Sequence, residues 1–410
     1  MHPPPVNEPP AAGPASGEPR TWLSPSSRAP SMFAPAGDDT TADQALGRTR
    51  NGEGLVYQGD YHNARQLLAA MARRLREHPP RKGRMGAGRN QRSAHAQPVE
   101  ALTRAFQEER RQVRLEHEVL SRLAVPVGSL LGGVVGGGWT LPLRRAPDVA
   151  EACTEALGAA PEGGGLLPLR DLLGIIGAHE WRRRGVNVPA LDGQVIPHFG
   201  VYAPVRGEYV DLAAQAAEAW PVRGKRALDV GTGTGVLALV LAQRGATVLA
   251  TDLEPRAVAC ARENAERLGL AAAVEVRRAD LFPEPEAAGA ALAYDLVVSN
   301  PPWVPAEAHT PLDRAVYDPG GRFLSRLLAG LPGALAPGGE AWLILSDLAE
   351  RLGLRADGEV ERRAAAAGVV VAAVLTARPT HPRARAGQGA DPLGAARSAE
   401  VTRLFRLVKA

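Results

Sequence analysis

The chain contains little cysteine and few aromatic side chains. Only two of its 410 residues are cysteines, Cys153 and Cys260, and they lie far apart in the sequence. Two isolated thiols exclude a disulfide framework and a cysteine-rich zinc site, so we expect no metal centre and a reducing, cytoplasmic environment. Aromatic residues make up 4% of the chain, but the hydrophobic content of 45% is normal for a globular protein. The length is sufficient for two domains that each bury a core.

Net charge and long apolar runs are scarce as well. The formal charge of +4 is small for this length and does not by itself indicate a nucleic-acid partner, because such a partner requires a basic patch. The N-terminal residues lack the basic and apolar regions of a secretory signal. One uncharged run, residues 123–143, has the length of a membrane span, but its six glycines and two prolines weaken a helix. We therefore expect a buried, glycine-rich turn region there and no membrane partner.

Composition divides the chain into four parts. Residues 1–50 are rich in Pro, Ala, Gly and Ser and predict a disordered tail, because they offer too little apolar surface to offset the entropy of ordering. Residues 51–185 predict a mostly helical N-terminal domain that is a candidate for substrate recognition. Residues 186–221 predict an extended segment and a helix that lead into the catalytic domain. Residues 222–410 alternate short apolar runs with amphipathic helices, which is typical of a doubly wound α/β sheet.

A basic stretch in the N-terminal domain has two interpretations. It contains eight basic residues against Glu77 alone, namely Arg73, Arg74, Arg76, Arg81, Lys82, Arg84, Arg89 and Arg92. Such a stretch can contact the phosphates of RNA. It can also be a solvated loop between two helices, and its glycine and proline content favours this second interpretation.

A glycine-rich turn follows the first strand of the catalytic domain. Residues 226–230 predict a strand that runs directly into Gly231, Gly233 and Gly235, whose backbone N–H groups can approach a ligand closely. A turn of this kind also fits a nicotinamide-binding unit. However, Asp229 stands two residues before the first glycine, where its carboxylate would repel an anionic pyrophosphate. The ammonium and sulfonium groups of S-adenosylmethionine tolerate this acid, so the turn favours that cofactor.

Two further acids follow the next two strands. Asp252 comes after the strand predicted at residues 247–251, where a carboxylate can accept two hydrogen bonds from ribose hydroxyls. Asp280 follows the strand predicted at residues 273–277 and can accept a hydrogen bond from an adenine amino group, with Leu281 packed on the ring. Each acid alone has a simpler interpretation as a turn or helix cap. Three acids at the ends of three successive strands favour a nucleoside-containing ligand.

The fourth buried strand ends in the motif Asn300-Pro301-Pro302-Trp303. The two prolines restrict the backbone so that carbonyl oxygens and the Asn300 amide point into one small space. These acceptors can hold an NH₂ group and direct its nitrogen lone pair at a methyl donor, while Trp303 offers a flat face for stacking. A purely structural turn is the alternative interpretation, but such a rigid sequence is an unusual choice for one.

Together these motifs resemble the class I S-adenosylmethionine-dependent methyltransferases with an Asn-Pro-Pro-aromatic motif, over residues 186–410. This group includes release-factor glutamine methyltransferases, rRNA guanine methyltransferases and adenine methyltransferases of nucleic acids. The resemblance implies a Rossmann-like, seven-stranded, doubly wound sheet. It implies that S-adenosyl-L-methionine is bound by Asp229, Gly231, Gly233, Gly235, Asp252, Asp280 and Leu281. It also implies that Asn300, Pro301, Pro302 and Trp303 orient the methyl acceptor.

The acceptor itself is less closely specified. Residues 203–208 and 318–321 resemble segments of the glutamine methyltransferases, but Trp303 stands where those enzymes usually have tyrosine. We expect an N-methyltransferase acting on a planar amine, with an RNA or DNA base favoured and a protein glutamine as the alternative. More remote alternatives are a nicotinamide-dependent oxidoreductase and an inactive methyltransferase fold that serves as a binding module.

Overall fold

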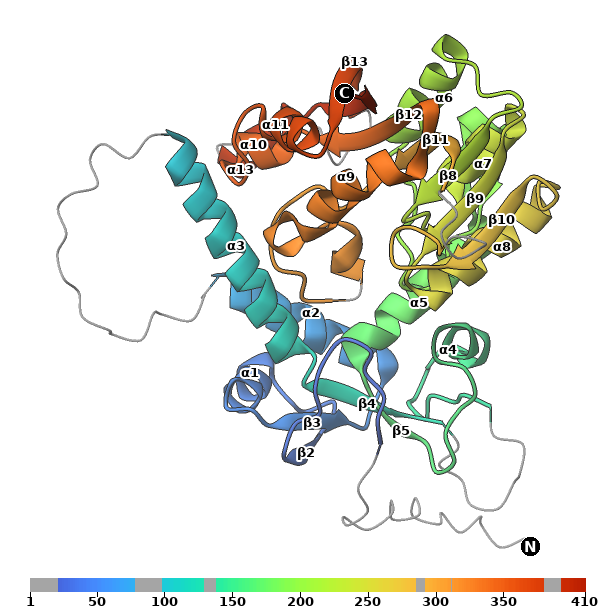
Figure 1. Ribbon diagram of the computed structural model, residues 1–410. Helices are drawn as coiled ribbons and strands as arrows, with labels where there is room; N and C mark the ends of the chain where they lie inside the picture. The colour runs from blue at the N-terminus through green and yellow to red at the C-terminus, as the bar shows by residue number, and fades with distance from the viewer. Residues whose placement is uncertain (1–20, 78–97, 129–137, 285–291, 311, 380–391) are drawn as a thin grey trace, which may run out of the picture.

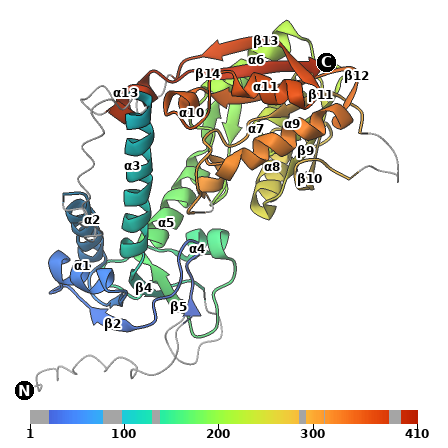
Figure 2. The same ribbon diagram turned by 60° about the vertical axis from the view of Figure 1, so that its left-hand side comes forward.

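Two α/β domains, each built around its own sheet, make up the computed structural model, which describes residues 21–77, 98–128, 138–284, 292–310, 312–379 and 392–410. In Figure 1 the N-terminal domain lies below the catalytic domain. The helices α3 (Pro98–Leu120) and α5 (Leu169–Arg184) run from the N-terminal sheet towards the catalytic domain, as Figure 2 shows. The end of α3 nearest the catalytic domain contacts α13 (Pro392–Ser398).

The N-terminal domain packs helices on a five-stranded sheet with the order β1-β5-β4-β3-β2. Its strands are β1 (Thr21–Trp22), β2 (Phe33–Ala36), β3 (Gly54–Tyr57), β4 (Leu123–Val127) and β5 (Gly165–Pro168). Only the β4–β5 pair is antiparallel. Besides α3 and α5, its helices are α1 (Ala42–Arg50), α2 (Tyr61–Glu77) and α4 (Ala150–Leu157). Helices therefore contribute more residues than strands, as predicted, but the sequence did not predict the sheet.

The prediction of disorder is wrong for residues 21–50. This segment contributes β1, β2 and α1, and α1 begins at a capping box in which Thr41 and Gln44 exchange hydrogen bonds between side chain and backbone. Ala45 and Leu46 of α1 are 0% and 3% exposed within the N-terminal core. The composition of this segment predicted disorder because each small alanine side chain buries little area. The same small side chains, however, allow α1 to pack closely against α2 and β3. Residues 1–20 of the predicted tail lie outside the described residues.

Replacing Leu46 by alanine is expected to lower the free energy of unfolding by about 2–5 kcal/mol, because it leaves a cavity in the N-terminal core. Met32→Ala, a change in the same segment at a side chain that is 65% exposed, is the matched control and is expected to have little effect. Denaturant titration of both variants measures the difference. Equal stability of the two variants would show that residues 21–50 do not belong to the folded core.

The three central strands of the N-terminal sheet, β3, β4 and β5, were not predicted because they are short and buried on both faces. All residues of β3, β4 and β5 are buried, so their sequences show no alternation of polar and apolar side chains. We expected the uncharged run at residues 123–143 to be a buried turn region. Its first five residues are buried but form the strand β4, and residues 129–137 lie outside the described residues. In the part of the chain that the structure describes, no helix is both long and apolar enough to cross a membrane.

The catalytic domain has the seven-stranded sheet that the sequence predicted, with the order β10-β9-β8-β11-β12-β14-β13. Its strands are β8 (Arg226–Val230), β9 (Thr247–Asp252), β10 (Val274–Arg278), β11 (Tyr294–Ser299), β12 (Leu335–Ser346), β13 (Val369–Ala377) and β14 (Thr402–Lys409). The five strands from β8 to β12 are parallel, and β14 lies antiparallel between β12 and β13. This arrangement confirms the Rossmann-like fold class.

Helices cover both faces of this sheet. On one face lie α6 (Glu208–Ala219), α7 (Val236–Gln243) and α8 (Pro255–Arg267). On the other lie α9 (Arg322–Ala334) and α11 (Glu359–Ala366), and the short α10 (Leu348–Arg351) follows β12. The predicted extended segment before α6 is a hairpin of β6 (Val186–Val188) and β7 (Gly193–Val195). Because the order of the strands reverses between β8 and β11, a crevice is expected at their carboxyl ends, where the predicted motifs meet.

Candidate active site

The loop between β8 and α7 is a tight glycine turn at the carboxyl end of the central strand. Gly231, Gly233 and Gly235 have φ angles of 73°, 56° and 84°, a backbone region that favours glycine. A Cβ atom at Gly235 would lie 3.1 Å from the Cβ of Ala261, so this glycine permits close packing of α7 against α8. Apart from Gly233 itself and its two chain neighbours, no described residue has an atom within 4 Å of a Cβ atom placed at Gly233. The turn at Gly233 therefore faces open space that a ligand can approach.

Asp229 is a buried acid directly beneath this turn. Its Oδ2 atom accepts hydrogen bonds from the Thr232 hydroxyl at 2.6 Å and from the Ala238 backbone N–H at 3.1 Å. Its Oδ1 atom has no hydrogen-bond partner among the described residues. Burial raises the pKa of this carboxyl group to about 7, which is the cost of holding an uncompensated negative charge away from water. A cationic ligand at the turn would relieve that cost, so the site fits S-adenosylmethionine better than an anionic pyrophosphate.

Asp252 connects the end of β9 to the same turn. Its Oδ2 atom accepts a hydrogen bond from the Gly233 N–H at 3.0 Å, and its Oδ1 atom accepts one from the Glu254 N–H at 2.9 Å. Burial raises the pKa of Asp252, although these backbone bonds oppose the shift. Each carboxylate oxygen can accept a further hydrogen bond. The carboxylate is thus held beside the open space at Gly233, where it can meet a pair of ribose hydroxyls.

Asp280 and Leu281 lie at the same edge of the sheet, but with contacts that the sequence did not predict. The exposed Asp280 carboxylate forms two hydrogen bonds, of 2.9 and 3.1 Å, with the Arg326 guanidinium of α9. Leu281 has a φ angle of 68°, unusual for a residue with a side chain, and its carbonyl accepts a hydrogen bond from the Thr251 hydroxyl at 2.7 Å. Its side chain is buried in the core on the α9 face. The predicted adenine contacts of both residues therefore remain a proposal.

The motif after β11 contains an internal hydrogen bond. The indole Nε1–H of Trp303 donates to the Asn300 Oδ1 atom at 2.7 Å. An amide oxygen has two lone pairs, so Asn300 can still accept one hydrogen bond from a substrate NH₂ group. The bond also holds the orientation of the Asn300 amide. The sequence predicted only a stacking role for Trp303 and did not predict this contact. The signal for it was the indole N–H, a donor that phenylalanine lacks.

A small pocket of about 40 Å³ opens beside this motif, and we call it the acceptor pocket. It is lined by Tyr202, Arg206, Tyr209, Asn300, Pro301, Trp303, Ala315 and Val316. The structure thus brings three of the four predicted residues of the motif to the pocket, whereas Pro302 is not among the lining residues. The guanidinium carbon of Arg206 lies 5.1 Å from the centre of the Trp303 ring. Arg206 therefore already covers part of the aromatic surface expected to stack on the acceptor.

Two buried carboxylates hold Arg206 in this position. Glu208 and Glu400 are both 3% exposed, and they approach Arg206 to 2.7 and 3.1 Å. The pocket wall at residues 203–208 is thus tied to the segment directly before β14. The sequence drew attention to residues 203–208 through a resemblance, but it contains no local signal for Glu400, which lies 194 positions after Arg206.

Similarity to known proteins agrees with this arrangement. Residues 194–351 match the family model described as the methyltransferase small domain. Over 148 residues the chain is 38% identical to a release factor glutamine methyltransferase of Bordetella pertussis. The aligned region covers 32% of this chain and 53% of that protein. Over 152 residues it is 35% identical to a ribosomal RNA small subunit methyltransferase C of Chromohalobacter salexigens, which covers 36% of this chain and 40% of that protein.

A third relative acts on a different class of RNA. Over 89 residues the chain is 45% identical to a tRNA1(Val) (adenine(37)-N6)-methyltransferase of Tolumonas auensis, which covers 20% of this chain and 35% of that protein. The chain spans about half the length, or less, of these curated relatives. The similarity lies in the catalytic domain and agrees with the family predicted from the motifs. Within this domain, residues 194–351 are thus similar in sequence to a methyltransferase small domain.

Proposed function

We propose that the protein is an S-adenosylmethionine-dependent N-methyltransferase that acts on a planar amine. One observation carries the proposal. The buried Asp229 lies near the end of β8 and the open Gly233 turn follows that strand, and the Asn300 amide follows the adjacent strand β11, whose Ser299 pairs with Val230. A cationic cofactor and a planar NH₂ group would thus meet at the ends of two hydrogen-bonded strands. A nicotinamide cofactor fits less well, because Asp229 would face its pyrophosphate.

The residues of the chain position and orient the acceptor. When bound, S-adenosylmethionine supplies an electrophilic methyl group on its sulfonium. The Asn300 Oδ1 atom and the Pro301 carbonyl would accept the hydrogens of the acceptor amine, which exposes its nitrogen lone pair. Trp303 holds the Asn300 amide through the hydrogen bond at 2.7 Å. The proton released from the amine can pass to water, so the reaction needs no histidine, cysteine or lysine as a base.

A base in RNA or DNA is our first candidate for the acceptor. The broad indole of Trp303 suits a base, and the basic stretch at residues 73–92, which begins in the last turns of α2, would suit phosphates. Within this stretch, Arg74 pairs with Asp43 at 3.1 Å and Arg76 with Glu116 at 3.6 Å, while Arg81, Lys82, Arg84, Arg89 and Arg92 lie outside the described residues. Support for the nucleic acid therefore comes mainly from the pocket and from the RNA-modifying relatives.

A protein glutamine is the second candidate. Its amide is smaller than a base and suits a pocket of about 40 Å³ in which Arg206 covers part of Trp303. The release factor glutamine methyltransferase of Bordetella pertussis among the relatives favours the same acceptor.

Transfer of a labelled methyl group from S-adenosylmethionine into a fractionated lysate tests the function and separates the two candidates. Label that is removed by nuclease and survives protease supports a nucleic-acid base, and the reverse pattern supports a protein glutamine. Calorimetric binding of S-adenosylmethionine without any incorporation would instead indicate a binding module. Tight binding of NAD without binding of S-adenosylmethionine would refute the proposal.

Asp252→Ala is expected to weaken S-adenosylmethionine binding by about 1–3 kcal/mol, through loss of hydrogen bonds to a charged acceptor and loosening of the turn at Gly233. The matched control is Glu254→Ala, which removes a more exposed acid two positions later and leaves its backbone N–H in place. Calorimetry of both variants measures the effect. If the two variants bind the cofactor equally well, Asp252 does not contact it.

A further inference from the structure

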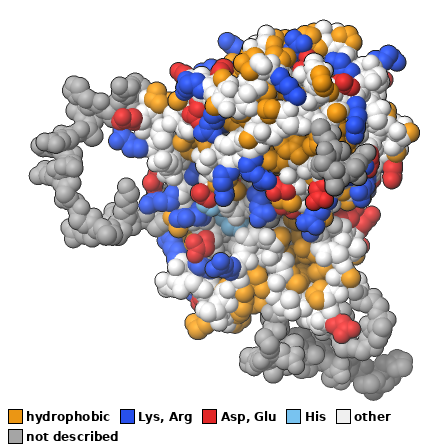
Figure 3. All heavy atoms as spheres, viewed as in Figure 1, with side chains coloured by type: hydrophobic (Ala, Val, Ile, Leu, Met, Phe, Trp, Pro, Cys, Tyr) orange, Lys and Arg blue, Asp and Glu red, His pale blue; other side chains and the backbone are white. Residues whose placement is uncertain are grey.

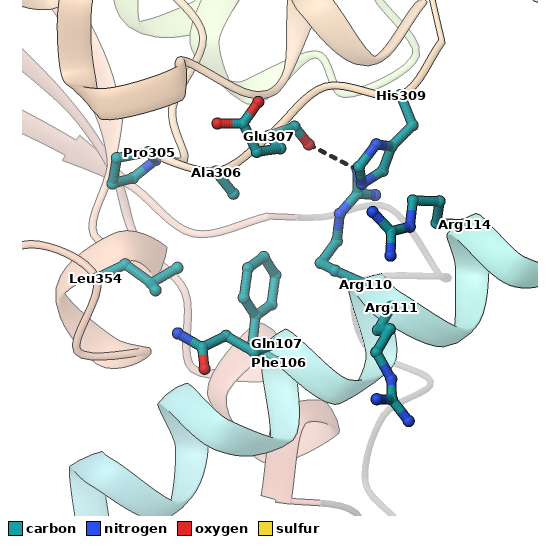
Figure 4. A pocket seen from close by; sticks show the side chains of 10 residues that line it. All are labelled: Phe106, Gln107, Arg110, Arg111, Arg114, Pro305, Ala306, Glu307, His309 and Leu354. Atoms are coloured by element: carbon teal, nitrogen blue, oxygen red, sulfur yellow. Dashed lines mark hydrogen bonds between the residues drawn. The ribbon is translucent and has the colours of Figure 1, made fainter. Parts of the chain in front are cut away.

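A second, larger cleft lies between the two domains. It has a volume of about 350 Å³ and separates α3 of the N-terminal domain from the loop that follows Trp303 (Figure 4). Its lining residues are Phe106, Gln107, Arg110, Arg111, Arg114, Pro305, Ala306, Glu307, His309 and Leu354. We call it the basic cleft, because three arginines of α3 line it. Around the middle of the face shown in Figure 3, beside α3, Lys and Arg side chains gather near a histidine.

Arg110 is held rigidly at one side of this cleft. Its guanidinium donates hydrogen bonds to the Glu307 carbonyl at 3.0 Å and to the Asp313 carboxylate at 2.9 Å. The guanidinium carbon also lies 3.9 Å from the centre of the Tyr317 ring. These contacts link α3 directly to the catalytic domain, and the Asp313 carboxylate compensates the positive charge of Arg110.

The other two arginines are less firmly paired than Arg110. Arg111 is 41% exposed and has a 3.3 Å contact with Glu108, whereas Arg114 forms no hydrogen bond or ion pair with the described residues. Arg110 and Arg114 stand four positions apart on one face of α3, where like charges destabilise a helix. The pKa of His309 is lowered by burial and by both of these arginines, against the opposite effects of Asp313 and Glu307. Arg114 and the exposed Arg111 therefore offer guanidinium groups to an anionic ligand, with the Glu307 carboxylate as the one acid among the described residues that line the cleft.

The basic cleft adjoins the acceptor pocket. Phe106, Ala306 and Trp303 belong to one hydrophobic cluster, so the apolar floor of the cleft extends to the wall of the pocket. Val304 also forms a bridge with Tyr317. The neighbouring residue Val316 lines the acceptor pocket, while Tyr317 packs against Arg110 at the cleft. A flexible polymer with one unit in the pocket can therefore place the next unit in the cleft.

We propose that the basic cleft binds the phosphate backbone of a single-stranded nucleic acid beside the nucleotide whose base enters the acceptor pocket. This inference rests on the proposed methyltransferase function and specifies its substrate class. Guanidinium groups bind phosphates in a bidentate manner and stack on bases, and the apolar floor suits the face of a base. The volume is at the lower end of pockets for small ligands, which fits about one nucleotide. We specify a single-stranded nucleic acid because a base must leave its stack to enter a narrow pocket, which costs less in a single strand than in a duplex.

Fluorescence anisotropy with a labelled, mixed-sequence single-stranded RNA of about twelve nucleotides tests this inference without the cofactor. The double variant Arg111→Glu/Arg114→Glu is expected to weaken binding roughly tenfold or more and to reduce the salt slope by about 1.4, since each phosphate contact contributes about 0.7. The matched control is Arg183→Glu/Arg184→Glu, which makes the same charge change at arginines of α5 that are 67% and 79% exposed. The control is expected to bind as the unchanged protein does.

The inference is overturned if both double variants lose the same affinity, if the cleft variant loses none, or if the unchanged protein does not bind the RNA. It is also overturned if a polyglutamate peptide competes as well as unlabelled RNA, because an acidic protein segment would then be the ligand. Calorimetry with S-adenosylmethionine on the same samples separates this result from the proposed function. Cofactor binding without RNA binding contradicts the cleft alone, and RNA binding without cofactor binding contradicts the methyltransferase function alone.

Discussion

Asn300→Ala is expected to lower the rate of methyl transfer about a hundredfold or more while leaving S-adenosylmethionine affinity nearly unchanged. The reason is positional. Asn300 lies in the acceptor pocket, and the cofactor contacts that we propose come from the turn after β8 and from Asp252. Without the Asn300 amide oxygen, the acceptor amine loses a fixed hydrogen-bond acceptor in a partly buried pocket. Turnover of labelled methyl groups and calorimetry, measured on the same variant, separate the two effects.

Asn187→Ala is the matched control, because Asn187 is an exposed asparagine on β6 whose side chain has no role in the proposed site. It is expected to retain full activity. Full activity of Asn300→Ala as well would refute the mechanism.

The hydrogen bond between Trp303 and Asn300 adds a graded test of the same mechanism. Trp303→Phe keeps a stacking face but loses the N–H that holds Asn300 at 2.7 Å, so its turnover is expected to fall between that of the unchanged protein and that of Trp303→Ala. If stacking alone matters, Trp303→Phe is fully active. Equal losses in the phenylalanine and alanine variants would assign the whole effect to the lost hydrogen bond.

Asp229→Asn is expected to weaken S-adenosylmethionine binding about ten- to a hundredfold, because it removes the buried negative charge beneath the turn. The pH dependence follows from the same charge. Since burial raises the pKa of Asp229 from its ordinary value of 3.8 to about 7, the cofactor-free protein carries this charge mainly above pH 7. Cofactor affinity is therefore expected to fall as pH decreases through 7, by at most tenfold per pH unit. Asp229→Asn is expected to lose this dependence.

The raised pKa of Asp229 affects the stability of the cofactor-free protein in the opposite direction: cofactor affinity rises with pH, whereas stability falls. Between the ordinary and the raised pKa of Asp229, the folded protein binds a proton that the unfolded chain does not, so stability decreases as pH rises through this window. Asp229→Asn is expected to remove that decrease while it impairs cofactor binding. Asp357→Asn, at an exposed acid, is the matched control for both measurements. A cofactor affinity that is independent of pH in the unchanged protein would contradict this role of Asp229.

Much of the catalytic domain was predictable because its signals are local. The strand at Arg226–Val230, the glycine turn after it and Asp252 at the end of β9 lie within a short stretch of chain. In a parallel sheet the carboxyl ends of adjacent strands share one edge, so the sequence also indicated that Asn300 would lie near this turn.

The N-terminal sheet and the contacts around the pockets could be seen only in the tertiary structure. Fully buried strands such as β4 lack the alternation that reveals a half-buried strand, and the composition of residues 21–50 gave no sign of how closely α1 packs. The pairing of Asp280 with Arg326 and that of Arg206 with Glu400 join residues 46 and 194 positions apart.

By itself, the sequence determined the local features of the proposed site: a Rossmann-like sheet, a glycine turn with an acid beneath it, and an Asn-Pro-Pro-Trp motif after an adjacent strand. Only the tertiary structure decided what surrounds that chemistry. It placed α3 against the loop after Trp303, so that Arg110 meets Asp313 across 203 positions of sequence and the basic cleft adjoins the acceptor pocket. The physical reason is that local preferences specify turns and strands, whereas charge pairing and packing between distant segments depend on how the whole chain folds.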